Sequence, residues 1–295
     1  MSAQLFGCIE AGGTKFVLGV MRDHQTVLEE TRIPTTAPAE TLRACVEFFK
    51  DATRRNGRLN AVGIASFGPL GVRPHERGWG TIIRSPKTAW SGTDIVTPFK
   101  SAFNCPIGLD TDVNAAVLAE SLWGSAQRKD VATYVTVGTG IGGGVLINGK
   151  IVHGTRHPEM GHMIPRRHPA DGDFAGVCRF HNDCLEGLAS GPAIQRRWGA
   201  TLSELGHNHP AQRIIAFYLA QLVVAQRALL APQRIVFGGG VMASPGLLSR
   251  IRTEATLLER RYFSEEAASD LVVTSELGAR TGLLGALALA QTASR

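Results

Sequence analysis

Apolar, β-branched strands joined by glycine-rich turns open both halves of the chain. The strands are Leu5–Glu10 and Phe16–Val20 around the turn 11–15, then Val131–Val137 and Val145–Ile147 around the turn 138–144. Two such strands on either side of a glycine turn predict a β-hairpin. Glycine lets backbone N–H groups approach an anion because no Cβ stands in the way. The two hairpins therefore predict two similar lobes that hold a polyphosphate between them.

The elements after each hairpin follow the same order in both halves: strand, helix, strand, helix, strand and helix. In the first half we expect them at 26–33, 38–56, 61–66, 94–103, 106–109 and 115–123. In the second half we expect them at 150–153, 210–231, 234–237, 245–262, 271–274 and 281–290. This repeat predicts an α/β fold of two related lobes.

The domain boundaries follow from the same repeat. Residues 1–113 should form the first lobe, joined by the C-terminal helix 281–295, and residues 114–280 should form the second. A loop-rich insertion of about residues 154–205 interrupts the second lobe and contains little apolar sequence that could fix its conformation.

Composition limits the classes of function. A hydrophobic fraction of 44% and a charged fraction of 19% over 295 residues are typical of a globular protein. The net charge is +6, but Lys and Arg are scattered, so we expect no nucleic-acid partner. The longest apolar run, Leu283–Ala290, is shorter than the roughly 20 residues that cross a bilayer, and the first strand begins at once. We therefore expect a cytoplasmic protein without a membrane partner.

The glycine runs admit more than one interpretation. Residues 138–143 match the dinucleotide fingerprint G-x-G-x-x-G, but that fingerprint needs a helix after the glycines, and a strand follows here. We therefore exclude a dinucleotide site, and a purely structural hairpin remains the alternative to phosphate binding. A third run, Gly238–Gly240, follows a buried strand and suits either a bound nucleoside or a tight turn.

The segment Asp110–Asn114 lies between a predicted strand and a predicted helix. Asp112 could be the general base that accepts the proton of an attacking hydroxyl, since a nearby carboxylate activates an alcohol in this way. It could also be the N-cap of the helix, a frequent role for Asp. Asn114 could bind a sugar or simply belong to the first helical turn.

Two Cys and two His residues in the insertion have the spacing of a metal site. They are His162, Cys178, His181 and Cys184. Thiolates and imidazoles are the ligands that zinc prefers, and four of them form a closed, structural site. His153, His157 and His168 are alternative first ligands.

Glu159, His162 and Glu186 flank this predicted zinc site. Glu and His side chains suit hydrogen bonds to vicinal sugar hydroxyls. The alternative is that the two Glu residues lie on the surface and that the His is only a metal ligand.

Taken together, these motifs resemble the ROK family of sugar kinases, and most closely its zinc-dependent fructokinase branch. The resemblance spans essentially the whole chain. It rests on residues 10–15, 66–69, 110–114, 138–143, 159–162, 178–186 and 238–240. It implies the two-lobed actin-like ATPase (ribonuclease H-like) fold with a zinc-binding insertion.

The resemblance also implies an activity and roles for single residues. The family transfers the ATP γ-phosphoryl group to a hexose, with Mg²⁺ on the phosphates, and a homodimer is usual. Asp112 would be the base, with Asn114, Glu159, His162 and Glu186 as sugar-binding candidates. His162, Cys178, His181 and Cys184 would hold zinc. The ATP-binding candidates are Gly12, Gly13, Thr14, Lys15, Gly138, Thr139, Gly140, Gly142, Gly238, Gly239 and Gly240.

Three positions depart from the commonest pattern of the family. Glu10 replaces Asp, Thr111 replaces a sugar-binding Asn, and His181 replaces a zinc Cys. At all three positions the chain is similar to the fructokinase branch. We therefore expect fructose to be converted to fructose 6-phosphate. A kinase for mannose, glucose or an N-acetylated amino sugar is the alternative, followed by a non-catalytic ROK-type sugar sensor. A Thr hydroxyl cannot make the contacts of an Asn amide, which argues against glucose.

Overall fold

The computed structural model describes residues 4–85, 87–260, 262–263 and 268–295. The chain divides into two compact units. Unit 1 comprises residues 1–123, 153–157 and 279–295, and unit 2 comprises residues 124–152 and 158–278. The division falls after Trp123 rather than after residue 113, because the helix that begins at Asp112 packs against the C-terminal helix of unit 1.

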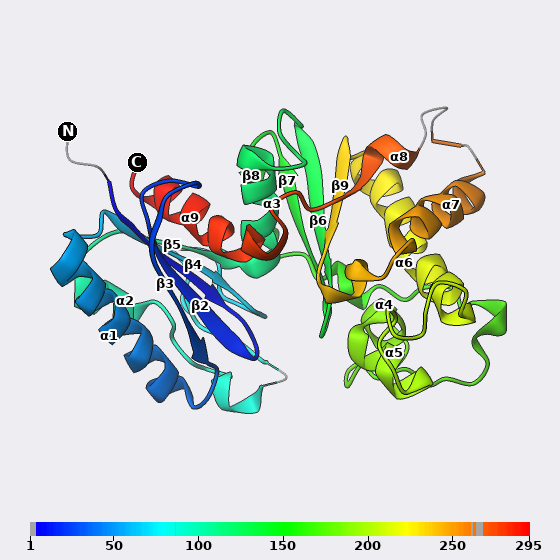
Figure 1. Cartoon of the computed structure of the whole chain (residues 1–295), viewed down its shortest axis with the longest axis horizontal. Helices are drawn as coiled ribbons and strands as arrows, with labels where there is room; N and C mark the ends of the chain where they lie inside the picture. Colours follow the sequence, from blue (N-terminus) through cyan, green and yellow to red (C-terminus); the bar gives the residue numbers. More distant parts are fainter. Residues whose placement is uncertain (1–3, 86, 261, 264–267) are drawn as a thin grey trace. The chain divides into compact units, whose positions relative to one another are not determined.

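Unit 1 is built on a five-stranded sheet in the order β3-β2-β1-β4-β5. The strands are β1 Phe6–Ala11, β2 Lys15–Met21, β3 Val27–Pro34, β4 Ala61–Ser66 and β5 Ile107–Thr111. The helices are α1 Pro38–Asn56, α2 Thr97–Phe103, α3 Asp112–Trp123 and α9 Thr281–Ala293. The first three strands pair antiparallel, whereas β4 and β5 run parallel to β1. Figure 1 shows α1 and α2 on one side of this sheet and α9 on the other.

The backbone of helix α9 lies directly against the backbone of the sheet. A Cβ at Gly63 of β4 would overlap the carbonyl oxygen of Ala286, and a Cβ at Gly108 of β5 would overlap that of Leu289. Gly285 of α9 in turn allows contact with the backbone of Ala115 in α3. Small residues on both sides therefore let the C-terminal helix pack against β4, β5 and α3, which lie far from it in the sequence.

Unit 2 repeats the plan with a sheet in the order β10-β9-β6-β7-β8. The strands are β6 Val131–Val137, β7 Ile141–Ile147, β8 Lys150–Ile151, β9 Arg234–Gly238 and β10 Val272–Thr274. Strand β7 starts at Ile141, so the turn is limited to 138–140 and is shorter than the expected 138–144. Gly142 pairs with Thr136 of β6. The glycines continue the strand because the antiparallel ladder supplies hydrogen-bond partners for their backbone.

The helices of unit 2 include three that the sequence pattern did not predict. The helices are α4 Leu185–Ala189, α5 Gly191–Trp198, α6 Pro210–Leu230, α7 Leu247–Glu259 and α8 Ala268–Leu271. The three that were not predicted are α4, α5 and α8. Helices α4 and α5 lie in the insertion and are too short for a clear helical periodicity. Five short 3₁₀ turns complete the described elements: Thr88–Trp90, Met160–His162, Pro169–Asp171, Gly240–Ala243 and Gly278–Arg280.

Helix α6 is the core helix of unit 2. Its length and apolar composition would suffice to cross a membrane, but 56% of its most apolar window is buried inside the protein. Ile214, Phe217, Tyr218 and Leu222 all belong to the buried cluster, as expected for one face of a core helix. Leu229 is an exception, because it lies in the last turn and is 82% exposed.

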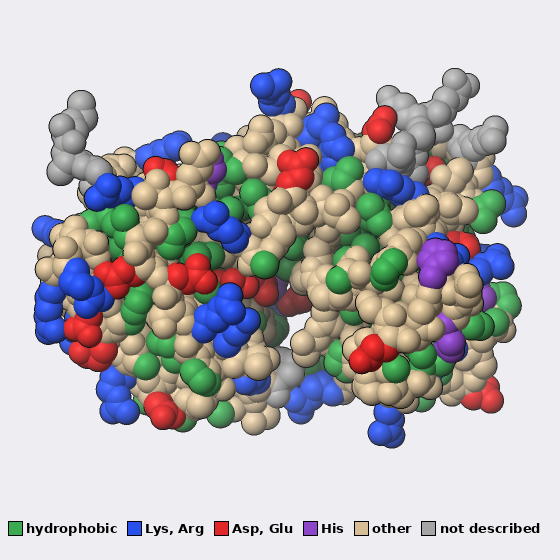
Figure 2. Space-filling model, in the orientation of Figure 1, with side chains coloured by type: hydrophobic (Ala, Val, Ile, Leu, Met, Phe, Trp, Pro, Cys, Tyr) green, Lys and Arg blue, Asp and Glu red, His purple; other side chains and the backbone are tan. Residues whose placement is uncertain are grey.

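The surface carries both signs of charge. Figure 2 shows Lys and Arg side chains interspersed with Asp and Glu on the face that is drawn. The scatter of basic residues along the sequence is therefore also visible on this face of the folded chain.

The close approach of α9 predicts a large effect of one methyl group. Gly63→Ala would place a Cβ against the Ala286 carbonyl, and neither backbone can yield easily. We expect a loss of about 3 kcal/mol in the free energy of unfolding, measured by urea denaturation. Gly154→Ala is the control, because a Cβ there would meet its nearest neighbour, the Arg156 carbonyl, at an ordinary 3.8 Å. Equal stability of the two variants would contradict this packing.

Candidate active site and metal site

The first glycine turn of unit 1 is tightly closed. The Gly12 N–H donates to the Lys15 carbonyl at 3.1 Å, and the Thr35 hydroxyl donates to the Gly12 carbonyl at 2.8 Å. A Cβ at Gly13 would lie 3.8 Å from Cε of Lys87, so a second lysine stands beside the turn. The turn thus combines a backbone that an anion can approach with two cationic side chains, Lys15 and Lys87, and it is suited to bind an anion.

The N-cap of α3 is Thr111 rather than Asp112. The Thr111 hydroxyl accepts the backbone N–H of Asn114 at 3.2 Å, three residues further on, as an N-cap side chain does. Asp112 is half-buried at the first helical position, and its Oδ1 accepts the backbone N–H of Val113 at 2.9 Å. Thr111 is also only 2% exposed.

Asn114 points into the protein. Its side chain is completely buried, and its amide Nδ2 donates to Oδ1 of Asp110 at 2.7 Å. These contacts support the alternative in which Asn114 belongs to the first helical turn and holds it to the end of β5.

Glu10 is electrostatically coupled to the same region of unit 1. Burial raises the pKa of Glu10 above its ordinary value, the negative charge of Asp112 raises it further, and Lys15 partly offsets both effects. A Cβ at Gly282 would overlap the Glu10 carboxyl group, so the start of α9 packs directly on this residue. Unit 1 therefore brings together a glycine turn, two carboxylates and a lysine.

The other two glycine runs meet at the carboxyl ends of the interior strands β6 and β9 in unit 2. A Cβ at Gly138 would lie 4.0 Å from the backbone nitrogen of Gly240. The Gly138 carbonyl accepts the N–H of Gly191, the first residue of α5, at 2.7 Å. Gly239 has a φ of 91° and no room for a Cβ beside Val137, so the fold itself requires glycine there.

The sugar-binding candidates of unit 2 interact with this end of the sheet and with one another. Oε2 of Glu186 in α4 accepts the backbone N–H of Ile141, at the start of β7, at 2.9 Å. Burial raises the pKa of Glu159; the charge of Glu186 also raises it, whereas His162 lowers it. Glu159, His162 and Glu186 are therefore close enough for their charges to interact.

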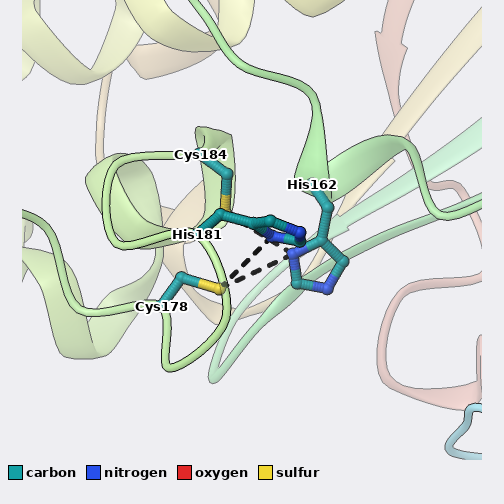
Figure 3. Close-up of side chains that lie close together, drawn as sticks. All are labelled: His162, Cys178, His181 and Cys184. Carbon is teal, nitrogen blue, oxygen red and sulfur yellow. Dashed lines mark hydrogen bonds between the residues drawn. The ribbon is translucent and has the colours of Figure 1, made fainter.

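The four predicted zinc ligands converge. One ligand atom from each of His162, Cys178, His181 and Cys184 lies within 4.8 Å of all the others. Figure 3 shows the two rings and the two side-chain sulfurs pointing toward a common centre. His162 comes from the 3₁₀ turn 160–162, Cys178 and His181 from the following loop, and Cys184 from the N-cap of α4. The predicted cluster therefore exists in the fold.

The geometry of this cluster fits zinc. Nδ1 of His162 lies 3.7 Å from Sγ of Cys178 and 3.5 Å from Sγ of Cys184, and Nδ1 of His181 lies 3.8 Å from Sγ of Cys178. Zinc–sulfur and zinc–nitrogen bonds in a tetrahedral site place neighbouring ligand atoms roughly 3.6 Å apart. Burial raises the pKa of the Cys184 thiol to about 11, so the thiolate needs a cation to form at neutral pH.

The alternative metal ligands lie elsewhere. Nδ1 of His168 accepts the N–H of Ala170, and Nε2 of His157 accepts the N–H of Leu70 at 3.2 Å. His153 belongs to unit 1, where its Nε2 lies 2.8 Å from Oδ2 of Asp110. None of these three histidines belongs to the cluster formed by the described residues.

Sequence reasoning gave no specific role to Lys87 or Asp110, and it named His153 only as an alternative metal ligand. Lys87 lies in a loop without a motif, and Asp110 and His153 are 43 residues apart in the sequence. A buried Asp directly after a strand was the available signal for Asp110. The contact with His153 had no signal, because it depends on residues 153–157 belonging to unit 1.

Comparisons with known proteins agree with this fold. The model of the ROK family matches residues 6–293. The chain is 49% identical to a fructokinase of Zymomonas mobilis, covering 98% of this chain and 97% of the relative. It is 40% identical to a putative fructokinase of Bacillus subtilis, covering 98% and 96%.

Solved structures give the same result. A ROK hexokinase from Thermus thermophilus superimposes with a TM-score of 0.80 at 28% identity, covering 98% of both chains. A ROK glucokinase from Streptomyces griseus, in complex with glucose and AMPPNP, gives 0.71 at 25% identity, covering 98% of this chain and 99% of that one. The predicted actin-like ATPase fold is thereby confirmed, and the chain belongs to the ROK family.

Proposed function

We propose that this chain is an ATP-dependent fructokinase that converts D-fructose to fructose 6-phosphate. The observation that carries the proposal is the near-complete match to relatives named fructokinase, at 49% and 40% identity. The organisation of Asp112 in unit 1 supports it, because a half-buried carboxylate at the start of a capped helix is suited to act as a general base.

In this proposal Asp112 accepts the proton of the attacking primary hydroxyl as its oxygen bonds to the γ-phosphorus, while the bond from that phosphorus to the bridging oxygen breaks and ADP leaves. An alcohol is a weak nucleophile, and a carboxylate within hydrogen-bond reach both orients it and removes its proton. The protein itself forms no other covalent bond in this phosphoryl transfer. Catalysis therefore rests on positioning the reactants and on stabilising the charge that develops.

The glycine turns 12–14 and 138–140 would bind the phosphates through backbone N–H groups, with Gly238–Gly240 beside the nucleoside. Lys15 and Lys87 would add positive charge beside the first turn. Mg²⁺ bound to the phosphates would neutralise part of the charge that develops during transfer. Glu10 lies beside the first turn, and its carboxylate oxygens suit a hard cation, which leaves Asp112 free to act as the base.

Glu159, His162 and Glu186 would bind the sugar hydroxyls. His162 can serve two ligands, because Nδ1 faces the cysteine sulfurs and leaves the opposite ring nitrogen, Nε2, for a hydroxyl. Glu186 would then connect sugar binding to the turn 138–140 through its hydrogen bond to Ile141.

The four-residue cluster would hold a structural zinc ion. Four protein ligands fill a tetrahedral shell, so the ion would fix the loop that joins the 3₁₀ turn 160–162 to α4. The metal would thereby hold Glu159 and Glu186, which flank the ligands in sequence, in a defined position.

The substrate assignment predicts a ranking of sugars. With MgATP, the rate of ADP release should have the highest kcat/KM for fructose among fructose, mannose, glucose and N-acetylmannosamine, measured by a coupled assay. A preference of at least about tenfold corresponds to about 1.4 kcal/mol, the net contribution of one hydrogen bond. Equal rates with all four sugars, or a higher value for another sugar, would contradict the assignment.

The role of Asp112 predicts a specific loss. Asp112→Asn should lower kcat by about 10²–10⁴-fold, since the amide cannot accept the proton, while the KM values for fructose and ATP change little. Steady-state kinetics measure this loss, and circular dichroism checks the fold. Turnover within threefold of the unchanged protein would remove Asp112 from the role of base.

The metal site predicts a stoichiometry. Purified protein should contain about one zinc ion per chain by elemental mass spectrometry, and Cys178→Ser should lose most of it. Cys105→Ser is the matched control, because this buried cysteine lies in unit 1 and outside the cluster. Folded, zinc-free wild-type protein would disprove the site.

A further inference from the structure

A buried carboxylate at the end of β5 has partners from three places in unit 1. Oδ1 of Asp110 accepts the backbone N–H of Thr111 at 2.8 Å and the amide Nδ2 of Asn114 at 2.7 Å. Oδ2 of Asp110 lies 2.8 Å from Nε2 of His153, and the Asp110 side chain is 3% exposed. A buried carboxylate is costly unless hydrogen bonds and opposite charge compensate it, so these contacts hold one another in place.

Two of these partners, Thr111 and Asn114, flank in the sequence the residue assigned as the base. Thr111 caps α3 and precedes Asp112, and Asn114 follows it by two positions in the same helical turn. Both are tied to Asp110, one through its backbone and one through its side chain. The first turn of α3 is therefore fixed relative to the Asp110 carboxylate, and Asp112 lies within it.

His153 reaches this turn from a distant part of the sequence. It lies in segment 153–157, which belongs to unit 1 although both flanking stretches belong to unit 2. The same segment is held by the guanidinium of Arg73, which donates to the Gly154 carbonyl, and by His157, which accepts the Leu70 N–H at 3.2 Å. The residues that follow His153 are thus held to unit 1 at two points.

We propose that His153 is a positioning residue for Asp112, which acts through Asp110 on the first turn of α3. The inference rests on the proposed function, in which Asp112 is the base. His153 does not exchange the substrate proton in this account. It supplies a hydrogen bond and a positive charge to the buried carboxylate that organises the turn.

The charge of His153 is favoured by this contact. The hydrogen bond with Asp110 raises the pKa of His153 above its ordinary value of 6.5, whereas burial and the positive charge of Arg73 oppose the rise. A pKa that is raised in the folded state contributes stability below pH 6.5, and this stability is lost as the pH rises through the folded-state value.

The first experiment tests the ion pair. The melting temperatures of the wild-type protein and of His153→Gln are compared from about pH 5.5 to about pH 8.5, a range that spans His titration. Gln keeps an N–H donor and lacks the charge, so the advantage of the wild type should be largest at the acidic end and shrink as the pH rises. An advantage that is constant, or that grows with pH, would contradict the ion pair and the proposal with it.

The second experiment is a double-mutant cycle on kcat. His153→Leu should lower kcat by about 10–100-fold with little change in either KM, because a small displacement of the base is costly in the transition state. His153→Gln should restore most of this loss. In the Asp112→Asn background, His153→Leu should lower the residual rate less than about threefold, since there is no base left to position.

His24→Leu is the matched control. The His24 ring stacks on Trp123 at the other end of α3, with ring centroids 5.2 Å apart, so this variant changes a histidine contact to the same helix without touching its first turn. It should leave kcat unchanged in both backgrounds. Losses that multiply fully for His153→Leu and Asp112→Asn would overturn the positioning role. An inactive wild type would instead refute the proposed function.

Discussion

The backbone contact of α9 with strands β4 and β5 is the constraint on which unit 1 depends. Gly63 and Gly108 remove side chains from β4 and β5 so that the helix can lie against them, and Gly285 brings it against α3. The same helix covers Glu10 at its start. Because β5 ends at Thr111 and α3 starts at Asp112, the position of Asp112, the proposed base, depends on how helix α9 packs.

Both units place polar chemistry on a frame of buried contacts. In unit 1 the capped start of α3 and the buried Asp110 define the turn around Asp112. In unit 2 four Cys and His side chains converge from a loop with little apolar sequence, and Glu186 in the adjoining helix α4 accepts the N–H of Ile141, next to the turn 138–140. A hydrophobic core alone would not orient these side chains, because apolar packing is not directional.

Much of the fold was predictable because its signals are local. Periodicity located α1 and β4 at their observed bounds, and the Cys–His spacing identified all four members of the cluster. The turn 138–144 was predicted too long because glycine residues are typical of turns. In the structure the glycines at 142–144 instead pair with residues of β6. Helices α4 and α5 are too short for periodicity. The pairing of Asp110 with His153 could not be predicted, because it depends on tertiary structure alone.

The most direct test of the account is the identity of the phosphorylated product. Carbon-labelled fructose and MgATP are incubated with the protein, and the carbon that bears the new phosphoester is assigned by ³¹P-coupled NMR. Fructose has two chemically similar primary hydroxyls, so the position of the phosphate reports how the sugar is held against the base. The account predicts phosphate on the C6 oxygen and no product with Asp112→Asn on the same timescale. Phosphate on the C1 oxygen, or ADP formed without a sugar phosphate, would contradict it.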